Sequence, residues 1–268
     1  MSINIIHLIK HKCPNISNII GTKNQYWTNV QKVYIQRLEY IKHSAIVGNH
    51  NFFWKSIIDD MILFKKERTK LDSFLSDIDS KVKSIYDNIC NDKKKVDKLR
   101  KILEQLILPQ ESESKSYDRI AEIYAINYLI SQRHLKIIEL EFLLQNRKRM
   151  DCLIQDTQNN GYLLIDIFSI KIDSSKVESS DNFLKFLSRK ILNKYLDKTN
   201  NLDSCIYPIR VFPVLWIDQN FSKDYFDHLI DCETEINTEF YMIRGIHNIT
   251  EDKYQTIFGT IKDLKYLT

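Results

Sequence analysis

Two aspartates in the second half of the chain have the residue type and the setting of metal ligands. Asp151 stands in the run RMDCLIQ, and Asp166 stands between Ile165 and Ile167 in the apolar run YLLIDIFSIKI. Mg²⁺ takes oxygen ligands and usually binds only one or two carboxylates of a protein. Such an ion can generate hydroxide and neutralise the charge that develops on a phosphate during phosphodiester cleavage. An aspartate between two isoleucines could instead cap a neighbouring element or pair with an arginine, and this alternative stays open.

The elements that must position these aspartates are a helix and three strands. Apolar residues recur at helical spacing from Tyr117 to Tyr128, which predicts a helix with one apolar face. Asn159-Asn160-Gly161 is a hairpin-turn signal between the second and third strands. Three runs rich in β-forming residues predict the strands, and these are Leu135–Leu144, Arg149–Gln155 and Tyr162–Ile172.

This order of elements resembles the core of the PD-(D/E)XK nuclease-like superfamily, which includes restriction endonucleases and Holliday-junction resolvases. In that superfamily an acid on the second strand and an acid on the third hold one or two Mg²⁺ ions, and a helical glutamate often joins the site. The resemblance implies that Asp151 and Asp166 bind Mg²⁺ or Mn²⁺ and that Glu122 supports them. It also implies a restriction-endonuclease-like mixed α/β domain over residues 115–268.

One position departs from the pattern of the superfamily. A lysine two residues after the second acid helps to activate water there, and in this sequence that position is Phe168. Lys171 lies five residues after Asp166, and an odd offset along a strand places it on the opposite face. It could reach the site only through a β-bulge. Lys171, Lys185 and Arg189 are therefore the candidates for a displaced catalytic lysine.

A helix is predicted over Phe183–Leu196, and basic residues form a stripe on its exposed face. This stripe could hold a nucleic-acid backbone, and its members are Lys185, Arg189, Lys190, Lys194 and Lys198. The remaining predictions are a strand over Tyr207–Asp218, a helix over Asp224–Cys232, a strand over Phe240–Arg244 and a closing helix over Thr250–Leu267. Thr250 is the expected N-cap of the closing helix.

The first part of the chain favours helices. Residues 1–22 fit a strand or a docked helix, and residues 24–46 predict a helix. Over residues 52–108 apolar side chains follow a three-four alternation in which only Arg68 and Asp92 are polar. We favour a self-associating coiled coil for this segment, which would make the chain a homodimer or join it to a partner protein. A hairpin that turns near Asn88–Lys95 is the alternative.

Composition bounds the other possibilities. Leu108-Pro109 and the polar Ser/Glu stretch after it predict a boundary between a helical domain at 1–108 and the α/β domain at 115–268. The net charge of +4 permits nucleic-acid binding but falls short of a strongly basic footprint. The five cysteines are scattered and form no CxxC motif, which favours a reducing compartment. No run predicts a membrane span, so the cytoplasm is the expected location.

Two functions compete on this evidence. The first is a metal-dependent nuclease in which Asp151, Asp166, Glu122 and Lys171 form the catalytic group. The second keeps the nuclease-like fold without catalysis and binds nucleic acid or a protein partner. Phe168 favours the second, because lysine, glutamine or glutamate there would favour catalysis. A role in phage defence fits either function by association with other proteins of A+T-rich genomes.

Overall fold

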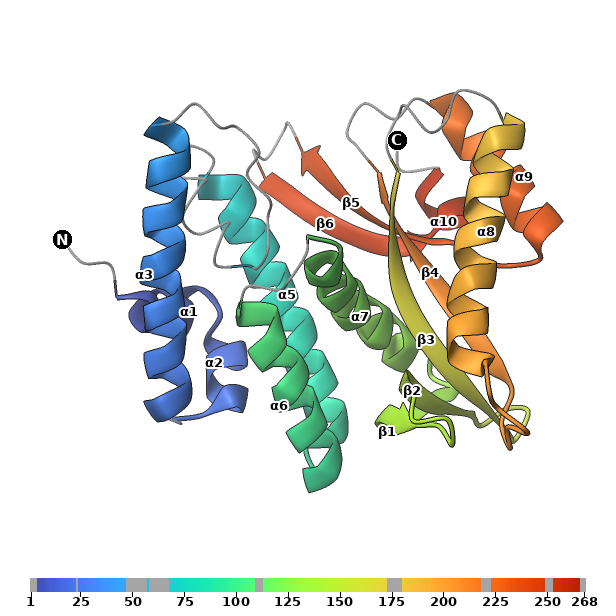
Figure 1. Cartoon of the computed structure of the whole chain (residues 1–268), viewed down its shortest axis with the longest axis horizontal. Helices are drawn as coiled ribbons and strands as arrows, with labels where there is room; N and C mark the ends of the chain where they lie inside the picture. The colour runs from blue at the N-terminus through green and yellow to red at the C-terminus, as the bar shows by residue number, and fades with distance from the viewer. Residues whose placement is uncertain are drawn as a thin grey trace. The chain divides into compact units, whose positions relative to one another are not determined.

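The protein was analysed as a computed structural model that describes residues 4–22, 24–46, 57, 68–108, 113–172, 180–217, 223–248 and 253–265. The chain forms two compact units (Figure 1). The first comprises Met1–Ile123 with Ile246–Thr256, and the second comprises Tyr124–Gly245 with Ile257–Thr268. No helix in the described part of the chain has both the length and the apolar character needed to cross a membrane.

Helices build most of the first unit. Its N-terminal segment is a pair of short helices rather than a strand, and Asp79 joins them to the helix over Arg68–Ile89. The Asp79 carboxylate accepts hydrogen bonds from the backbone N–H groups of Asn15 (3.2 Å) and Ile16 (2.9 Å). Unsatisfied N–H groups at a helix start need such an acceptor. The helices of this unit are α1 (Ile5–Lys12), α2 (Pro14–Ile20), α3 (Asn24–Ile46), α5 (Arg68–Ile89) and α6 (Lys93–Ile107).

The long apolar stripe folds as a hairpin in the described residues. Helix α5 ends at Ile89, and α6 begins at Lys93 after a turn of three residues. Asp92, one of the two polar interruptions of the stripe, is the N-cap of α6 and accepts from the N–H groups of Lys94 and Lys95. The described residues of this segment thus adopt the hairpin alternative, the coiled coil is not confirmed, and association of the chain with a second copy or a partner stays a prediction.

The second unit is built on a mixed sheet, and the predicted α/β architecture is confirmed there. Six strands lie in the order β1-β2-β3-β4-β5-β6, antiparallel between β1, β2 and β3 and parallel from β3 through β4 to β5. The strands are β1 (Leu135–Leu143), β2 (Arg149–Asp156), β3 (Gly161–Ile172), β4 (Ile209–Ile217), β5 (Tyr241–Asn248) and β6 (Lys253–Thr260). The remaining helices are α7 (Glu113–Ser131), α8 (Ser180–Thr199), α9 (Lys223–Ile236) and α10 (Ile261–Lys265). By the division into units, α7 up to Ile123, β5 from Ile246 and β6 up to Thr256 belong to the first unit.

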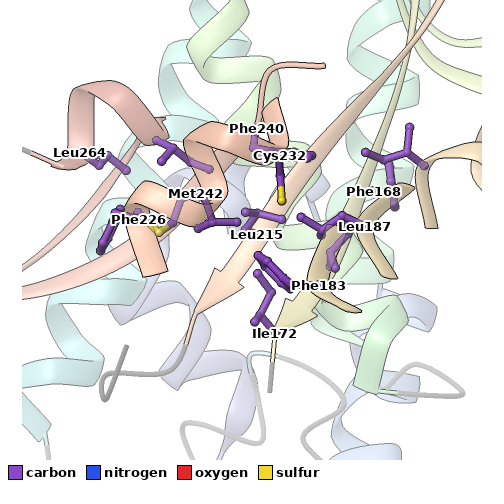
Figure 2. Close-up of a cluster of buried hydrophobic side chains, with 14 of the residues drawn as sticks. Phe168, Ile172, Phe183, Leu187, Leu215, Phe226, Cys232, Phe240, Met242 and Leu264 are labelled. Atoms are coloured by element: carbon purple, nitrogen blue, oxygen red, sulfur yellow. The ribbon is translucent and has the colours of Figure 1, made fainter. Parts of the chain in front are cut away.

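Helices α8 and α9 connect the parallel strands and cover one face of the sheet. Figure 2 shows Phe183 and Leu187 of α8 directed at the sheet, where Phe168 and Ile172 of β3 are buried with them. Parallel strands need such crossover helices, which then bury the sheet. Phe168, which occupies the lysine position of the superfamily pattern, is thus part of the hydrophobic core.

The predicted closing helix over Thr250–Leu267 is wrong for most of its described length. Residues 253–260 form strand β6, and only Ile261–Lys265 is helical. Ile257, Ile261 and Leu264 have helical spacing, which explains the error, but Phe258 stacks on Tyr241 at 5.9 Å and 8°. The start of the short helix is capped by Thr260, whose Oγ1 accepts from the N–H of Asp263 at 3.1 Å. The predicted cap, Thr250, lies outside the described residues.

Candidate functional site

Asp151 and Asp166 lie next to each other across strands β2 and β3. The antiparallel ladder ends at the pair Cys152–Ile165, and the two aspartates are the next residue on each strand. Beyond this pair the Asp151 side chain takes the role of a backbone acceptor. Its Oδ2 accepts a hydrogen bond from the backbone N–H of Ile167 at 2.5 Å. The sequence therefore placed the two acids on the correct strands and in the same part of the sheet. Asp151 acts here as a cap for the neighbouring strand.

Asp166 is buried in contact with two lysines. Its side chain is 1% exposed, and its carboxylate oxygens lie 2.7 Å from Nζ of Lys198 and 3.3 Å from Nζ of Lys194. Burial raises the pKa of Asp166 above its ordinary value, and the two lysines act in the opposite direction. Buried charges are stable only when they are paired. The three side chains, called here the Asp166 triad, satisfy that requirement.

The turn between β1 and β2 holds the C-terminal end of α8 in place. Nδ2 of Asn146 donates to the carbonyl oxygens of Lys198 (2.8 Å) and Asn200 (2.9 Å), which would otherwise be unsatisfied at the helix end. Nζ of Lys198 also donates to the carbonyl oxygen of Arg149. Lys148 pairs with Asp197 at 2.7 Å on the outer side of the same helix turn. These contacts fix the position from which Lys198 reaches Asp166.

Lys194 lies beside the residue that replaces the superfamily lysine. Its Nζ is 5.6 Å from the centre of the Phe168 ring, a distance at which a cation is attracted to an aromatic face. The same Nζ contacts Asp166. The ammonium group of Lys194 thus comes from α8 to the neighbourhood that a lysine at position 168 would occupy.

The structure describes the surroundings of the other two predicted catalytic residues, Glu122 and Lys171, whose catalytic roles stay predictions. Glu122 belongs to the first unit, where it is buried and its Oε2 lies 2.6 Å from Nη1 of Arg119. Lys171 is exposed on β3, and the cations that contact Asp166 are Lys194 and Lys198 instead. Sequence reasoning placed Lys194 and Lys198 only in the exposed basic stripe. A signal for their inward position exists, because both continue the three-four spacing of Phe183, Leu187 and Ile191.

The predicted basic stripe on α8 divides into two groups. Lys185, Arg189 and Lys190 are exposed, as a surface that contacts nucleic acid requires. Lys190 also lies over the Phe186 ring at 5.7 Å. Lys194 and Lys198 turn toward the sheet and belong to the Asp166 triad. The exposed group therefore retains three of the residues that the sequence assigned to this stripe.

The Asp166 triad is a poor fit to the Mg²⁺ or Mn²⁺ ion that the superfamily resemblance implies. Two ammonium groups already contact the single carboxylate of Asp166. Mg²⁺ also keeps several water ligands, for which a carboxylate that is 1% exposed leaves little access. Within the described ranges no group of three or more His, Cys, Asp or Glu side chains could hold a metal ion.

The comparisons with known proteins were weak. No family model and no curated protein matches the chain. Among solved structures, the chain is similar to Pyrococcus furiosus SfsA in complex with Ca²⁺, with 15% sequence identity and a TM-score of 0.25. The match covers 55% of this chain and 61% of that one, so it spans less than two thirds of the length of SfsA. Similarity of this degree gives no support for a shared function.

Proposed function

We propose that the chain is a nuclease-like module that binds nucleic acid without cleaving it. The observation that carries this proposal is the Asp166 triad, in which two ammonium groups contact one buried carboxylate. In a cleaving site the acids must be available to a cation, whereas here two lysines of α8 take the place of that cation. Phe168 points the same way, because it is a core residue where the superfamily pattern has lysine.

The exposed cations of α8 supply the binding surface in this proposal. Lys185, Arg189 and Lys190 lie within two helical turns on the exposed side of one helix. Neutralisation of phosphates by such residues releases counterions and makes binding depend on salt. The surface contains no element directed at base edges, so we expect affinity for the backbone with little dependence on sequence.

A second candidate is a nuclease whose lysine is supplied by α8, and one observation favours it. Lys194 contacts Asp166 and lies over Phe168, so its ammonium group stands near the position of the missing lysine. In this candidate Asp151 and Asp166 would hold Mg²⁺ or Mn²⁺ after the Asp166 triad opens. A role in phage defence would suit either candidate.

One set of assays separates the two candidates. The full chain and its Asp166→Ala variant are incubated with plasmid, single-stranded DNA and RNA in the presence of Mg²⁺ or Mn²⁺, and binding is followed in parallel without metal. We expect salt-dependent binding and no cleavage by either protein. Replacement of Lys185 and Lys190 by alanine should reduce the slope of log Kd against log salt by about one per lysine.

Three outcomes would change this assignment. Metal-dependent cleavage that disappears in Asp166→Ala would replace the binding module with the nuclease candidate. Cleavage that survives in the variant would place the activity outside this site. Absence of both binding and cleavage would overturn both candidates. Titration of the apo chain with Mn²⁺ by calorimetry gives an independent readout, because the binding module predicts no heat of binding at this site.

A further inference from the structure

Strand β4 has one open edge in the described structure. Its nine residues pair with β3 along their whole length, but pairing with β5 begins only at Val214. Among the described residues, the segment Ile209–Pro213 therefore has a paired strand on one side alone. Figure 1 shows β3 and β4 running side by side with α8 along the same part of the sheet.

The backbone groups of this edge point away from the sheet in a regular pattern. The N–H of Leu164 donates to the carbonyl of Pro208 at 2.9 Å, so Pro208, Arg210 and Phe212 direct their backbone groups at β3. Alternation along a strand then directs the N–H and C=O groups of Ile209 and Val211 outward. An added strand forms hydrogen bonds with alternate residues of its neighbour. The N–H and C=O groups of Ile209 and Val211 have this spacing. Nucleotides offer no comparable row of amide groups.

Two cavities adjoin this edge and form one groove, called here the β4 groove. One has a volume of about 450 Å³ and is bounded by α8, by Ile209–Val211 and by Ile236–Thr238. The other, of about 460 Å³, continues past Tyr195 and Ile209 to the loop before β4. Tyr195 and Ile209 line both cavities.

The β4 groove also gathers apolar side chains that are exposed to solvent. Four of the nine large exposed hydrophobic residues in the described structure belong to α8 or to the loop beside this groove. These are Leu192, Tyr195, Leu196 and Ile206, of which Ile206 is 84% exposed. Contiguous exposed apolar surface with a polar rim is typical of a site that binds a partner.

The charge of the β4 groove indicates which partner fits. Its lining residues include two arginines, Arg189 and Arg210, and no acidic side chain. Arg189 extends from α8 on one face of the sheet. Arg210 is exposed on the opposite face, because its neighbour Val211 packs with α8 in the core. Arginine binds carboxylates through two parallel hydrogen bonds. A partner that pairs with the strand edge would therefore be favoured if it carried acidic residues beside its apolar ones.

We propose that the β4 groove binds an extended peptide segment of a partner protein in which acidic residues alternate with apolar residues. The segment adds a short strand beside Ile209–Pro213, pairs with the outward N–H and C=O groups, and places its carboxylates at Arg210 on the face of the sheet opposite α8. Its apolar side chains contact Leu192 and Tyr195. Addition of a strand at an open sheet edge is an established mode of peptide recognition. This site is separate from the Asp166 triad and does not depend on the function proposed above.

A displayed library of random peptides, selected against the full chain, tests the proposal without knowledge of the natural partner. We expect enrichment of segments of about five residues with alternating acidic and apolar positions. The best peptide is then labelled with fluorescein, and its Kd is measured by anisotropy. Arg210→Glu should weaken binding by at least about tenfold, since a hydrogen bond to a charged group contributes that much.

Two further variants separate this site from general charge effects. Lys190→Glu makes the same kind of charge reversal on α8 next to Arg189, but outside the β4 groove, and should leave peptide binding within about twofold of the original. Val211→Pro removes one outward N–H, as Pro213 already does two residues later, and should abolish peptide binding. It should leave nucleic-acid binding unchanged, so failure of this proposal can be told from failure of the function proposed above. Circular dichroism and thermal unfolding confirm that each variant is folded.

Several results would overturn the proposal. Selection that yields no enriched peptides, or basic ones, would contradict the charge of the site. A peptide that binds Val211→Pro with unchanged affinity would exclude strand addition. If labelled oligothymidylate binds instead, and Arg210→Glu and Val211→Pro lose it, the β4 groove is a site for single-stranded nucleic acid.

Discussion

The carboxylate of Asp151 accepts a hydrogen bond from the backbone N–H of Ile167 at the point where the ladder between β2 and β3 ends. Residues 164 and 166 direct their backbone groups at β4, so Ile167 directs its N–H at β2 and would lack a partner without this side chain. The first acid of the expected metal pair therefore has a structural task that is independent of catalysis.

Replacement of this carboxylate tests the structural task. We expect Asp151→Ala to lower the free energy of unfolding by about 1–3 kcal/mol, because it leaves a partly buried N–H without an acceptor. Asp151→Asn keeps an acceptor oxygen and should cost less than half as much. Urea unfolding of the three proteins measures the difference. Equal stability of Asp151→Ala and the original chain would contradict the assignment of a cap.

Two ion pairs involve α8, and these are Lys198–Asp166 and Lys148–Asp197. Because they differ in burial, they should contribute differently to the free energy of unfolding. Lys198→Met leaves the buried carboxylate of Asp166 with only one ammonium partner, and we expect a loss of about 2–4 kcal/mol of stability. Lys148→Met is the matched control, since its pair with Asp197 is about half exposed. Such exposed pairs contribute about 0–1 kcal/mol. Comparable losses in the two variants, measured by urea unfolding, would argue against a buried triad.

The raised pKa of Asp166 predicts the sign of a pH effect. Between the ordinary pKa of 3.8 and the raised value in the folded chain, the folded state binds more protons than the unfolded state. Stability must then fall as pH rises through this window. We expect the melting temperature of the original chain to decline relative to that of Asp166→Asn as pH increases from about 4. Parallel curves for the two proteins, or a relative gain for the original, would contradict the direction of the shift.

Asp79 provides a test within the first unit. Its buried carboxylate accepts from two backbone N–H groups at the start of α2 and from Nδ2 of Asn15 at 2.7 Å. We expect Asp79→Ala to cost about 2–4 kcal/mol in thermal or urea unfolding, through loss of the cap and burial of unsatisfied donors. Asp77→Ala, two residues earlier on α5, removes a pair with Lys81 between neighbouring helix turns and should cost under about 0.5 kcal/mol. Similar losses at both positions would refute the capping role.

The sequence was informative where pattern and local chemistry agree. The bounds of α3 match the prediction of 24–46, and β1, β2 and β3 lie within one residue of their predicted runs. The hairpin signal at Asn159-Asn160-Gly161 is confirmed, since Asn160 has the positive φ of 50° that such turns require. The superfamily resemblance also implied that Asp151 and Asp166 lie on neighbouring strands, and they do.

Only part of the site could be predicted from the sequence. The two aspartates were placed on their strands, but the lysines that contact Asp166 were not recognised. A lysine on an amphipathic helix can direct its ammonium group to water or bury its carbon chain and reach a carboxylate. Composition cannot separate these outcomes, because the partner of Lys198 is thirty-two residues away in sequence. The same limit applies to the hairpin of α5 and α6. An apolar stripe with three-four spacing does not specify whether the helix that buries it belongs to the same chain or to another.

Pro213 has a consequence for the behaviour of this protein at high concentration. It stands at the end of the open edge of β4, where its ring nitrogen has no hydrogen to offer. The outward N–H donors of this edge are therefore those of Ile209 and Val211. Pairing of β4 with β5 begins at Val214. A short guest segment can be satisfied by two donors, whereas a long strand from another molecule would meet a gap. The edge can thus remain open for recognition while sheet-to-sheet polymerisation into fibrils is discouraged.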